Sequence, residues 1–323
     1  MVLEIIRNFR VGFAIILITF LIGATAAIAI VPTVAYSQSI PSVPNNASIN
    51  TVNNNKKVVI LNFDDAFESQ YANAKPILDK YGYKSTYYVV CNYIGNSGRL
   101  TWEDITALSN EGHDIGSHTM NHADLSKTSK KETEFEIGDS KQCLLDHGIN
   151  TTSFAYPFNA GSDEASVIDV VAKYYDIART ARSAPEPIMY LHCDGFKDQS
   201  SQTDCRTYSG DGELTFANRY SIIGWSHDAD RYKYSYDDSG MFDRFVEVVN
   251  SPSRYNTDGT IHAIPIVIWH RIDNSGEGDP KVYATTPDLF QKEINYLHDN
   301  GFKVLTMADL GYDENSNYLY LKR

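Results

Sequence analysis

The chain has 323 residues, of which 42% are hydrophobic and 21% are charged, so its composition excludes a wholly disordered or fibrous protein. With 28 Lys and Arg residues against 41 Asp and Glu residues, the formal net charge is −13. A surface of that sign repels the phosphates of nucleic acids. We therefore expect one large catalytic domain with a tail, and no nucleic-acid partner.

The first 36 residues have the features of an export signal or a membrane anchor. Arg7 and Arg10 precede an uncharged stretch over residues 11–38, which is apolar through Ala35 and long enough to cross a bilayer as a helix. Small residues around Ala35 also offer cleavage sites, so both a cleaved and an uncleaved segment remain open. In either case we expect the remainder to be extracellular or anchored with its catalytic domain outside.

Residues 37–56 are rich in Ser, Asn and Pro and have no apolar periodicity, which is typical of a tether. We expect the folded domain to occupy residues 57–323. Within it, the polar stretch over residues 181–218 is too long for a simple connection and indicates an insertion. The sequence shows no internal repeat and no further domain boundary.

After the tether, short β-branched or aromatic runs alternate with longer helical patterns. The predicted strands cover residues 58–63, 85–91, 114–118, 153–156, 176–180, 220–224 and 264–269. The predicted helices cover residues 70–81, 102–111, 128–146, 165–174, 239–249 and 287–299. Because repeated βα units build a parallel sheet, the pattern predicts an α/β fold, an incomplete (β/α) barrel of about seven parallel strands.

Two adjacent acids, Asp64 and Asp65, stand directly behind the first apolar strand. Active sites of barrel folds lie at the carboxyl ends of their strands. Charged residues there need ionic partners or a metal. Because paired Asp residues also occur in ordinary turns and helix caps, this pair alone does not identify a site.

Two histidines, His118 and His122, follow the strand predicted over residues 114–118. One helical turn would place both imidazoles on the same side. Two histidines and one carboxylate give three protein ligands and leave a position open, which is the arrangement of catalytic zinc. Zinc is therefore the expected metal, although cobalt and nickel suit the same ligands. The alternative is a pair of surface histidines.

At this point the chain resembles the polysaccharide deacetylases with NodB homology, carbohydrate esterase family 4. The resemblance extends from about residue 58 to residue 310 and implies a distorted, incomplete (β/α) barrel. It also implies metal-dependent removal of N-acetyl or O-acetyl groups from sugars. The segments that carry it, in the order of the family's motifs, are Asn62-Phe63-Asp64-Asp65, Ser117-His118-Thr119-Met120-Asn121-His122, Phe154-Ala155-Tyr156-Pro157-Phe158 and Val267-Ile268-Trp269-His270.

The resemblance assigns a role to five side chains. It makes Asp65, His118 and His122 the metal ligands. Asp64 becomes the general base and His270 the general acid. This division suits the chemistry, because hydrolysis of an amide or ester needs a group that deprotonates water and a group that protonates the leaving atom.

The third motif departs from the family pattern. By resemblance, the backbone N–H of Phe158 would donate to the oxyanion. Family members often carry an Arg that pairs with the catalytic Asp, and Ala155 stands at that position here. We expect Arg179 or Arg271 to supply the missing charge from another strand.

The carboxylate that supports His270 is the hardest site residue to assign. Asp228 and Asp230 are candidates, with solvated loop acids as the alternative. Trp225 and Trp269 are candidates for a wall that faces the acetyl group or the sugar, with buried core aromatics as the alternative.

Four cysteines in an exported domain could form two disulfides. Cys193 and Cys205 bracket the polar insertion, so we expect them to pair locally, which leaves Cys91 with Cys143. The alternative is that some of the four are free, buried thiols.

Together these features predict a metal-dependent hydrolase that deacetylates an extracellular N-acetylhexosamine polysaccharide. The expected partners are the acetylated glycan and, if the first segment is uncleaved, a membrane. O-acetyl esters remain open as the substrate. The alternative from another class is a carbohydrate-binding cell-surface protein with weak or no catalysis on the same barrel, which Ala155 favours.

Overall fold

The computed structural model describes residues 57–182, 188–190, 219–256, 259, 261–276, 282–313 and 318–322. All of them belong to one compact unit, Val52–Arg323. The predicted anchor, the tether and the greater part of the insertion over residues 181–218 lie outside the described residues. In the part of the chain that is described, no helix combines the length and the apolar character needed to span a bilayer.

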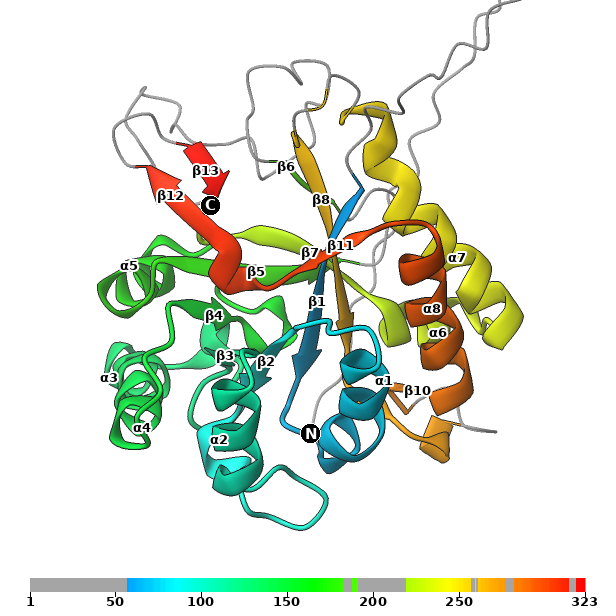
Figure 1. The fold of residues 1–323 in the computed structure, drawn as a ribbon. Coiled ribbons are helices and arrows are strands. Elements are labelled where there is room, and N and C mark those ends of the chain that lie inside the picture. The colour runs from blue at the N-terminus through cyan, green and yellow to red at the C-terminus, as the bar shows by residue number, and fades with distance from the viewer. Residues whose placement is uncertain are drawn as a thin grey trace, which may run out of the picture. The chain divides into compact units, whose positions relative to one another are not determined.

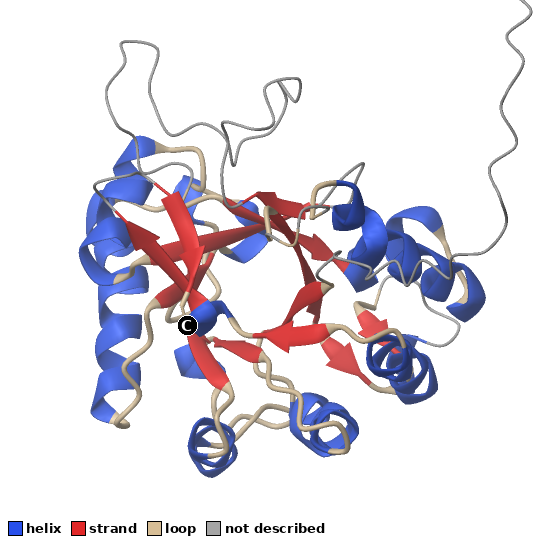
Figure 2. Cartoon of the chain, turned by 45° about the horizontal axis from the view of Figure 1, so that its top comes forward, coloured by secondary structure: helices blue, strands red, loops and turns tan. Residues whose placement is uncertain are grey.

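Seven parallel strands form a ring, which Figure 2 shows from its open end. The ring is closed because β1 also pairs with the last of these strands, with Ile60 opposite Ile266 and Phe63 opposite Trp269. The prediction of a (β/α) barrel of about seven strands is therefore confirmed. In ring order the strands are β1 (Val58–Asp64), β2 (Thr86–Val89), β3 (Asp114–Ser117), β4 (Ser153–Ala155), β5 (Ile177–Arg182), β7 (Ile222–Ser226) and β8 (Ala263–Trp269).

The described part of the chain contains six further strands, and the sequence analysis predicts none of them. Each has only two to four residues. β11 (Lys303–Leu305) runs parallel to the first half of β1, and β6 (Ile188–Tyr190) runs antiparallel to β8. The other four form two small sheets, β9 (Arg271–Ile272) with β10 (Ala284–Thr285), and β12 (Leu310–Asp313) with β13 (Tyr318–Leu321).

Helices lie outside the ring (Figure 1), and each of the six predicted helical segments is present. Two of these segments contain a π-helical turn, η1 (Gln70–Ala74) and η4 (Phe135–Asp139). The sequence analysis missed α6 (His227–Tyr234), which begins directly after β7. The remaining helices are α1 (Lys75–Asp79), α2 (Trp102–Asn110), α3 (Lys130–Glu134), α4 (Ser140–Asp146), α5 (Ala165–Tyr174), α7 (Asp238–Asn250) and α8 (Pro287–Asp299).

Aromatic rings fill the layer between the barrel and its helices. Trp269 packs edge-on against Phe290 of α8, with ring centroids 5.2 Å apart, and stacks on Phe63 of β1. Trp225 and Trp269 are both fully buried in this cluster. The expectation that they face the substrate is therefore wrong, because both side chains point from their strands toward the covering helices.

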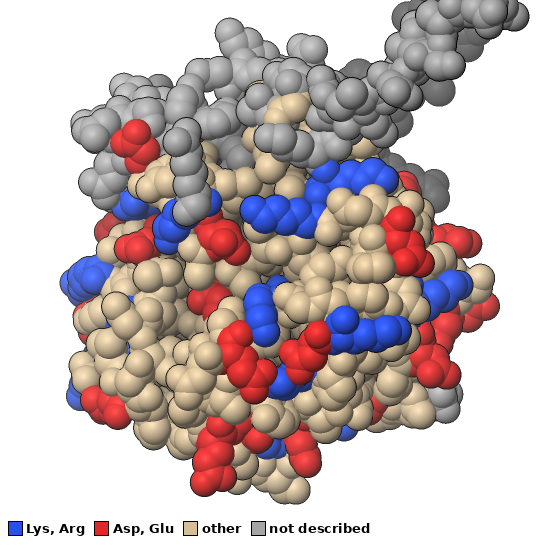
Figure 3. Space-filling view, in the orientation of Figure 1, with Lys and Arg blue, Asp and Glu red and all other residues tan. Residues whose placement is uncertain are grey.

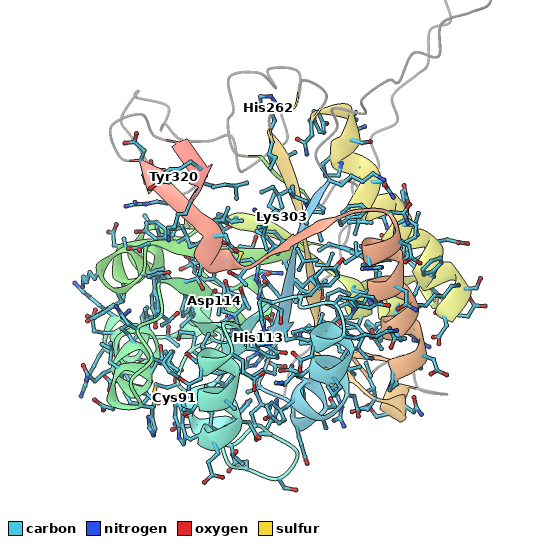
Figure 4. The ribbon with its side chains drawn as sticks, in the orientation of Figure 1. Cys91, His113, Asp114, His262, Lys303 and Tyr320 are labelled. Atoms are coloured by element: carbon cyan, nitrogen blue, oxygen red, sulfur yellow. A yellow bond between two sulfur atoms is a disulfide. The ribbon has the colours of Figure 1, made fainter. Side chains whose placement is uncertain are left out.

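A disulfide joins Cys91 and Cys143, as predicted. Cys91 opens the 3₁₀ turn after β2, and Figure 4 labels it on the side of the barrel that carries α4. The bond closes a loop across 52 positions of sequence, so it restricts the unfolded chain strongly. Cys193 and Cys205 lie outside the described residues, and their pairing stays a prediction.

Candidate active site

Side chains on six of the seven ring strands, or directly after them, line one cavity of about 780 Å³ at the carboxyl ends of the strands. This is the end of the barrel at which such folds place their active sites. On the face of the molecule in Figure 3, acidic and basic side chains are interspersed. Its lining consists of Asp64, Asp65, His118, His122, Tyr156, Phe158, Asn159, Arg179, Ala181, Ser226, Ala229, His270 and Tyr283.

The three predicted metal ligands converge at the edge of this cavity. The carboxylate oxygen Oδ1 of Asp65 lies 3.1 Å from Nε2 of His122 and 3.5 Å from Nε2 of His118. One potential ligand atom from each residue lies within 4.8 Å of the others. One cation could therefore contact all three side chains.

The surroundings of the triad leave its nitrogen and oxygen atoms available for a cation. Nδ1 of His118 donates to the carbonyl of Ala155 at 2.8 Å, which leaves Nε2 as the free lone pair. Burial lowers the pKa of His118 to about 4, so this ring is neutral near pH 7. Oδ1 of Asp65 is buried and accepts no hydrogen bond from the residues that the structure describes.

Asp65 is kept ionised by the charges around it. Burial alone would raise the pKa of the Asp65 carboxyl, but His122, His270 and His118 outweigh burial and hold this pKa well below its usual range. Nη1 of Arg99 also donates to the backbone oxygen of Asp65 at 2.6 Å. A buried carboxylate with two imidazoles is a donor set that fits a divalent cation such as zinc.

Left-handed backbone conformations are concentrated around the cavity. Asp65 has φ 73° and His122 has φ 60°, and neither is a glycine. Of the seven non-glycine residues with positive φ in the described part of the chain, four line the cavity. Such conformations cost free energy and persist where the surrounding structure imposes them, which is common at functional sites. The full set is Asp65, Ala66, Thr119, His122, Phe158, Asn159 and Ser235.

Asp64, the last residue of β1, forms a buried ion pair with Arg179 of β5. Nη2 of Arg179 donates to Oδ1 of Asp64 at 2.5 Å, and both side chains are almost inaccessible to solvent. The guanidinium also lies over the ring of Tyr88, 4.6 Å from its centroid. Arg179 thus places a cation beside Asp64 from another strand. This is one of the two alternatives that the sequence analysis gave for the missing charge.

The other candidate for this charge, Arg271, does not reach Asp64. Its Nε donates to Oδ2 of Asp273 at 2.9 Å. Its guanidinium lies over the ring of Phe67, at the rim of the barrel. The expectation for Arg271 is therefore wrong, because its side chain points away from the cavity that its neighbour His270 lines.

A glycine makes room for the buried guanidinium. A Cβ atom at Gly224 of β7 would come within 2.7 Å of Ile268 and 3.3 Å of Cδ of Arg179. A side chain at this position would therefore force Ile268 to move and would press on the Arg179 stem. The absence of a side chain at Gly224 thus leaves room for Arg179 beside Asp64.

His270 follows β8 and is held by Asp228 of α6. Nδ1 of His270 lies 2.9 Å from Oδ1 of Asp228, whose Oδ2 accepts from the backbone N–H of His270 at 2.8 Å. Burial alone would lower the pKa of His270, but Asp228, with Asp65 and Asp64, raises it to about 10. The imidazole is therefore protonated at neutral pH, and Nε2 is its remaining donor.

The two candidate acids of α6 have different partners. Asp228 supports His270, whereas Asp230 accepts from the indole Nε1 of Trp225 at 2.8 Å and lies 3.6 Å from Nε of Arg244. The expectation for Asp230 as a partner of His270 is therefore wrong. Both acids are buried, so the alternative of solvated loop acids is wrong as well.

A second buried pair fixes the start of α6. Nε2 of His227 lies 2.7 Å from Oε1 of Glu293 in α8, and neither side chain is exposed. Oγ1 of Thr285 lies 3.2 Å from the other ring nitrogen. Because His227 precedes Asp228 in the chain, this pair holds the helix end that presents Asp228 to His270.

Exposed aromatic rings flank the polar centre of the cavity. The side chain of Phe158 is 68% exposed and lies edge-on to the ring of His122. Tyr283 is 41% exposed, packs beside His270 and meets Tyr232 edge-on. Phe158 lines the cavity and has φ 57° and ψ 10°, and the donor role expected for its backbone N–H stays a prediction.

Sequence reasoning missed several residues at this end of the barrel. Tyr283 stands in no recognisable motif, and no sequence signal could have placed it beside His270. Gln70 is fully buried at the start of η1. In the helix predicted over residues 70–81, it is a polar residue on the apolar face. That mismatch was the only available sign of its special position.

A second group of potential metal ligands, formed by Asp79, Glu111 and His113, lies elsewhere in the described structure. Nζ of Lys75 lies 2.6 Å from a carboxylate oxygen of both Asp79 and Glu111. His113, labelled in Figure 4 where α2 leads into β3, accepts at Nδ1 from the backbone N–H of Ser85. A lysine cation thus already pairs with both acids.

Comparison with known proteins gives a family for part of the chain. The family model described as "Polysaccharide deacetylase" matches residues 51–175. This match supports the resemblance that the motifs indicated.

Three curated relatives are similar over parts of the chain. The putative polysaccharide deacetylase YxkH of Bacillus subtilis is 33% identical over 34% of this chain and 39% of its own length. A chitin deacetylase of Arthroderma benhamiae is 34% identical over 37% of this chain and 32% of its own length. A gellan lyase of a Bacillus species is 27% identical over 62% of this chain and 8% of its own length. The chain thus spans less than half of each of these relatives.

The Arg179–Asp64 pair predicts the stability of two variants. Arg179→Met should lower the free energy of unfolding by about 3 to 5 kcal/mol, because it leaves the Asp64 carboxylate buried without its partner. The double variant with Asp64→Asn should recover much of this loss, because it removes the stranded charge. Urea unfolding at pH 7, followed by circular dichroism, measures both. Equal stability of the single variant and the wild type would contradict the buried ion pair.

Proposed function

We propose, on the premise that residues 51–175 belong to the polysaccharide deacetylase family, that this chain hydrolyses acetyl groups from a glycan. The observation that carries the proposal is the meeting of three units in one cavity. They are the Asp64–Arg179 pair, the triad of Asp65 with two histidines, and the His270–Asp228 pair. An acyl hydrolase needs a base, an electrophilic centre and an acid, and each unit suits one of these tasks.

Asp65, His118 and His122 would hold a divalent cation, most readily zinc, with cobalt and nickel as alternatives. When bound there, such a cation lowers the pKa of water and polarises a carbonyl group. The chain's own contribution is to keep the ligands fixed. Ala155 orients the ring of His118, and Arg99 holds the backbone of Asp65.

Asp64 is the residue that would accept a proton from the attacking water. Arg179 occupies its Oδ1, so this ion pair fixes the rotation of the carboxylate and leaves Oδ2 as the oxygen that would accept the proton. The guanidinium comes from β5 instead of β4, where family members often carry it. Asp64 is thus oriented although Ala155 has no charged side chain.

His270 would donate a proton to the leaving nitrogen or oxygen of the sugar. Asp228 binds its Nδ1 side, so the proton to be donated is on Nε2. The raised pKa keeps this proton in place at neutral pH until negative charge develops on the leaving atom. The backbone N–H of Phe158, at the opposite wall beside His122, would add a donor to the oxyanion.

The exposed rings at the cavity support a sugar as the substrate. Phe158 lies on the side of the triad, and Tyr283 and Tyr232 lie on the side of His270. Flat aromatic faces pack against the C–H faces of sugar rings, so a glycan could lie across the cavity. The similarity to a chitin deacetylase favours an N-acetylhexosamine polymer, with O-acetyl esters as the second choice.

An extracellular site of action is part of the proposal. The apolar stretch over residues 11–38 behind basic residues is typical of a signal or anchor. The Cys91–Cys143 disulfide suits an oxidising environment outside the cytosol. The chain would therefore meet its glycan outside the cell, secreted or attached to the membrane.

The observation that favoured the alternative, a carbohydrate-binding protein without catalysis, no longer supports it. Ala155 suggested that the base is not oriented, but Arg179 fills that role from a neighbouring strand. The binding protein remains as an outcome of the activity test.

The proposal predicts acetate release by the full-length protein from N-acetylated chitin oligomers in the presence of zinc. Asp64→Asn should lower kcat by about 100-fold or more, because the general base is lost. His118→Ala, or a chelator, should abolish release, and zinc should restore the chelated wild type. An enzymatic acetate assay measures all of these changes.

The exposed histidine variant His298→Ala serves as the matched control and should keep wild-type activity. Binding of the oligomers without acetate release from N-acetylated or O-acetylated glycans would contradict the proposal and favour the binding protein.

The His270–Asp228 pair predicts the pH dependence of activity. Because His270 acts in its protonated form and its pKa is raised, activity should fall as pH rises through this pKa. Asp228→Asn removes the main cause of the raised pKa, so the alkaline limb of the kcat profile should move to lower pH. Profiles of both proteins between pH 6 and pH 10.5 measure the shift. An unchanged alkaline limb would contradict the assignment of His270 as the acid.

A further inference from the structure

One buried amide connects the backbones of the proposed base and the proposed acid. Nε2 of Gln70 donates to the carbonyl oxygen of Asp64 at 2.5 Å and to that of His270 at 2.6 Å. The Gln70 side chain is fully buried, and it bridges residues from the two ends of the folded domain. Neither the motifs nor the family assignment gives this residue a role.

The bridge stands where the barrel's own hydrogen bonds end. The pairing of β1 with β8 that closes the ring runs from Ile60 opposite Ile266 to Phe63 opposite Trp269. Asp64 and His270 are the next residue on each strand. The two N–H groups of one side-chain amide thus continue the connection between the strands by one step beyond the ladder.

Two neighbouring contacts attach the same turn to the chain beyond His270. Nδ2 of Asn73 donates to the carbonyl of Ile272 at 2.7 Å, and Oγ of Ser69 accepts from the backbone N–H of Ile272 at 3.1 Å. These bonds dock η1 on β9. Asn73 and Ser69 therefore also hold this turn in place. The bridge between the backbones of Asp64 and His270 is made by Gln70.

The acceptor side of the Gln70 amide is left without a partner. Oε1 of Gln70 is buried and accepts no hydrogen bond among the described residues. A buried polar atom without a partner costs stability, and such atoms in native structures call for a functional explanation. The Nε2 side of the same amide binds both carbonyl oxygens and so holds the backbones of Asp64 and His270 at a fixed separation.

We propose that Gln70 is a positioning residue that sets the distance between the base and the acid by holding their backbones on one amide. The inference rests on the proposed function, in which both groups act on the same acetyl-bearing sugar unit. Because the two proton transfers occur at different atoms of one bound group, a displacement of either backbone by about 1 Å would cost up to roughly 100-fold in rate.

The test compares two substitutions on the same turn in the full-length protein. Gln70→Leu keeps the size of the side chain and removes both donors, and Asn73→Leu removes a donor of the same kind that binds only Ile272. For acetate release from chitin oligomers, Gln70→Leu should lower kcat by about 10- to 100-fold with KM within about twofold of wild type. Asn73→Leu should leave kcat within about twofold of wild type. Thermal unfolding of both variants separates these effects from lost stability.

A variant of closer shape covers the case in which Gln70→Leu does not fold. Gln70→Glu keeps the shape but offers no donor when ionised and one when protonated, so its kcat should also fall while KM is kept. Wild-type kcat in a folded Gln70→Leu or Gln70→Glu protein would overturn the inference, as would an equal loss in Asn73→Leu.

A second measurement separates failure of this inference from failure of the proposed function. If the wild type releases no acetate, the proposed function fails, but the bridge can still be tested by NMR. The imidazole signals of His270 should broaden or double in Gln70→Leu and stay single and sharp in Asn73→Leu. Unchanged His270 signals in Gln70→Leu would show that the amide does not position this residue.

Discussion

The closure of the barrel between β1 and β8 is the constraint on which the site depends. It places Asp64 and Asp65 next to His270, although about two hundred residues separate them in sequence. The carboxyl ends of β3, β4 and β5 then add the histidines, Phe158 and Arg179 around the same rim. Every group that the proposed chemistry uses therefore reaches the cavity because parallel strands end at one edge of the ring.

Burial of so many charged groups at one rim is stable because most of them have a partner of opposite charge. Asp64 pairs with Arg179, and Asp228 pairs with His270. His227 and Glu293 pair behind them and hold the helix that carries Asp228. Asp65 differs, since its buried oxygen faces two imidazole nitrogens and accepts no hydrogen bond. This incomplete pairing is what a cation site requires, because the cation would supply the missing charge.

The ring strands were predictable because β-branched or aromatic residues alternate along the chain with helical patterns. The convergence of Asp65, His118 and His122 followed from their places after β1 and β3. Arg179 could be named only as one of two arginines, because the choice depends on register and on the space left by Gly224. α6 was missed because a helix of eight residues rich in polar side chains resembles a loop. For Trp225 and Trp269 the sequence left a substrate wall and a buried core open, because a strand at a barrel rim does not reveal which face its aromatic rings take; the core is correct.

Zinc binding tests the convergence of the triad most directly, without relying on a substrate. Calorimetric titration of zinc into the metal-free, full-length wild type should show one tight site. His118→Ala, His122→Ala and Asp65→Asn should each lose that site, whereas the exposed variant His298→Ala should keep it. Tight binding that persists in His118→Ala, or no tight site in the wild type, would contradict the account.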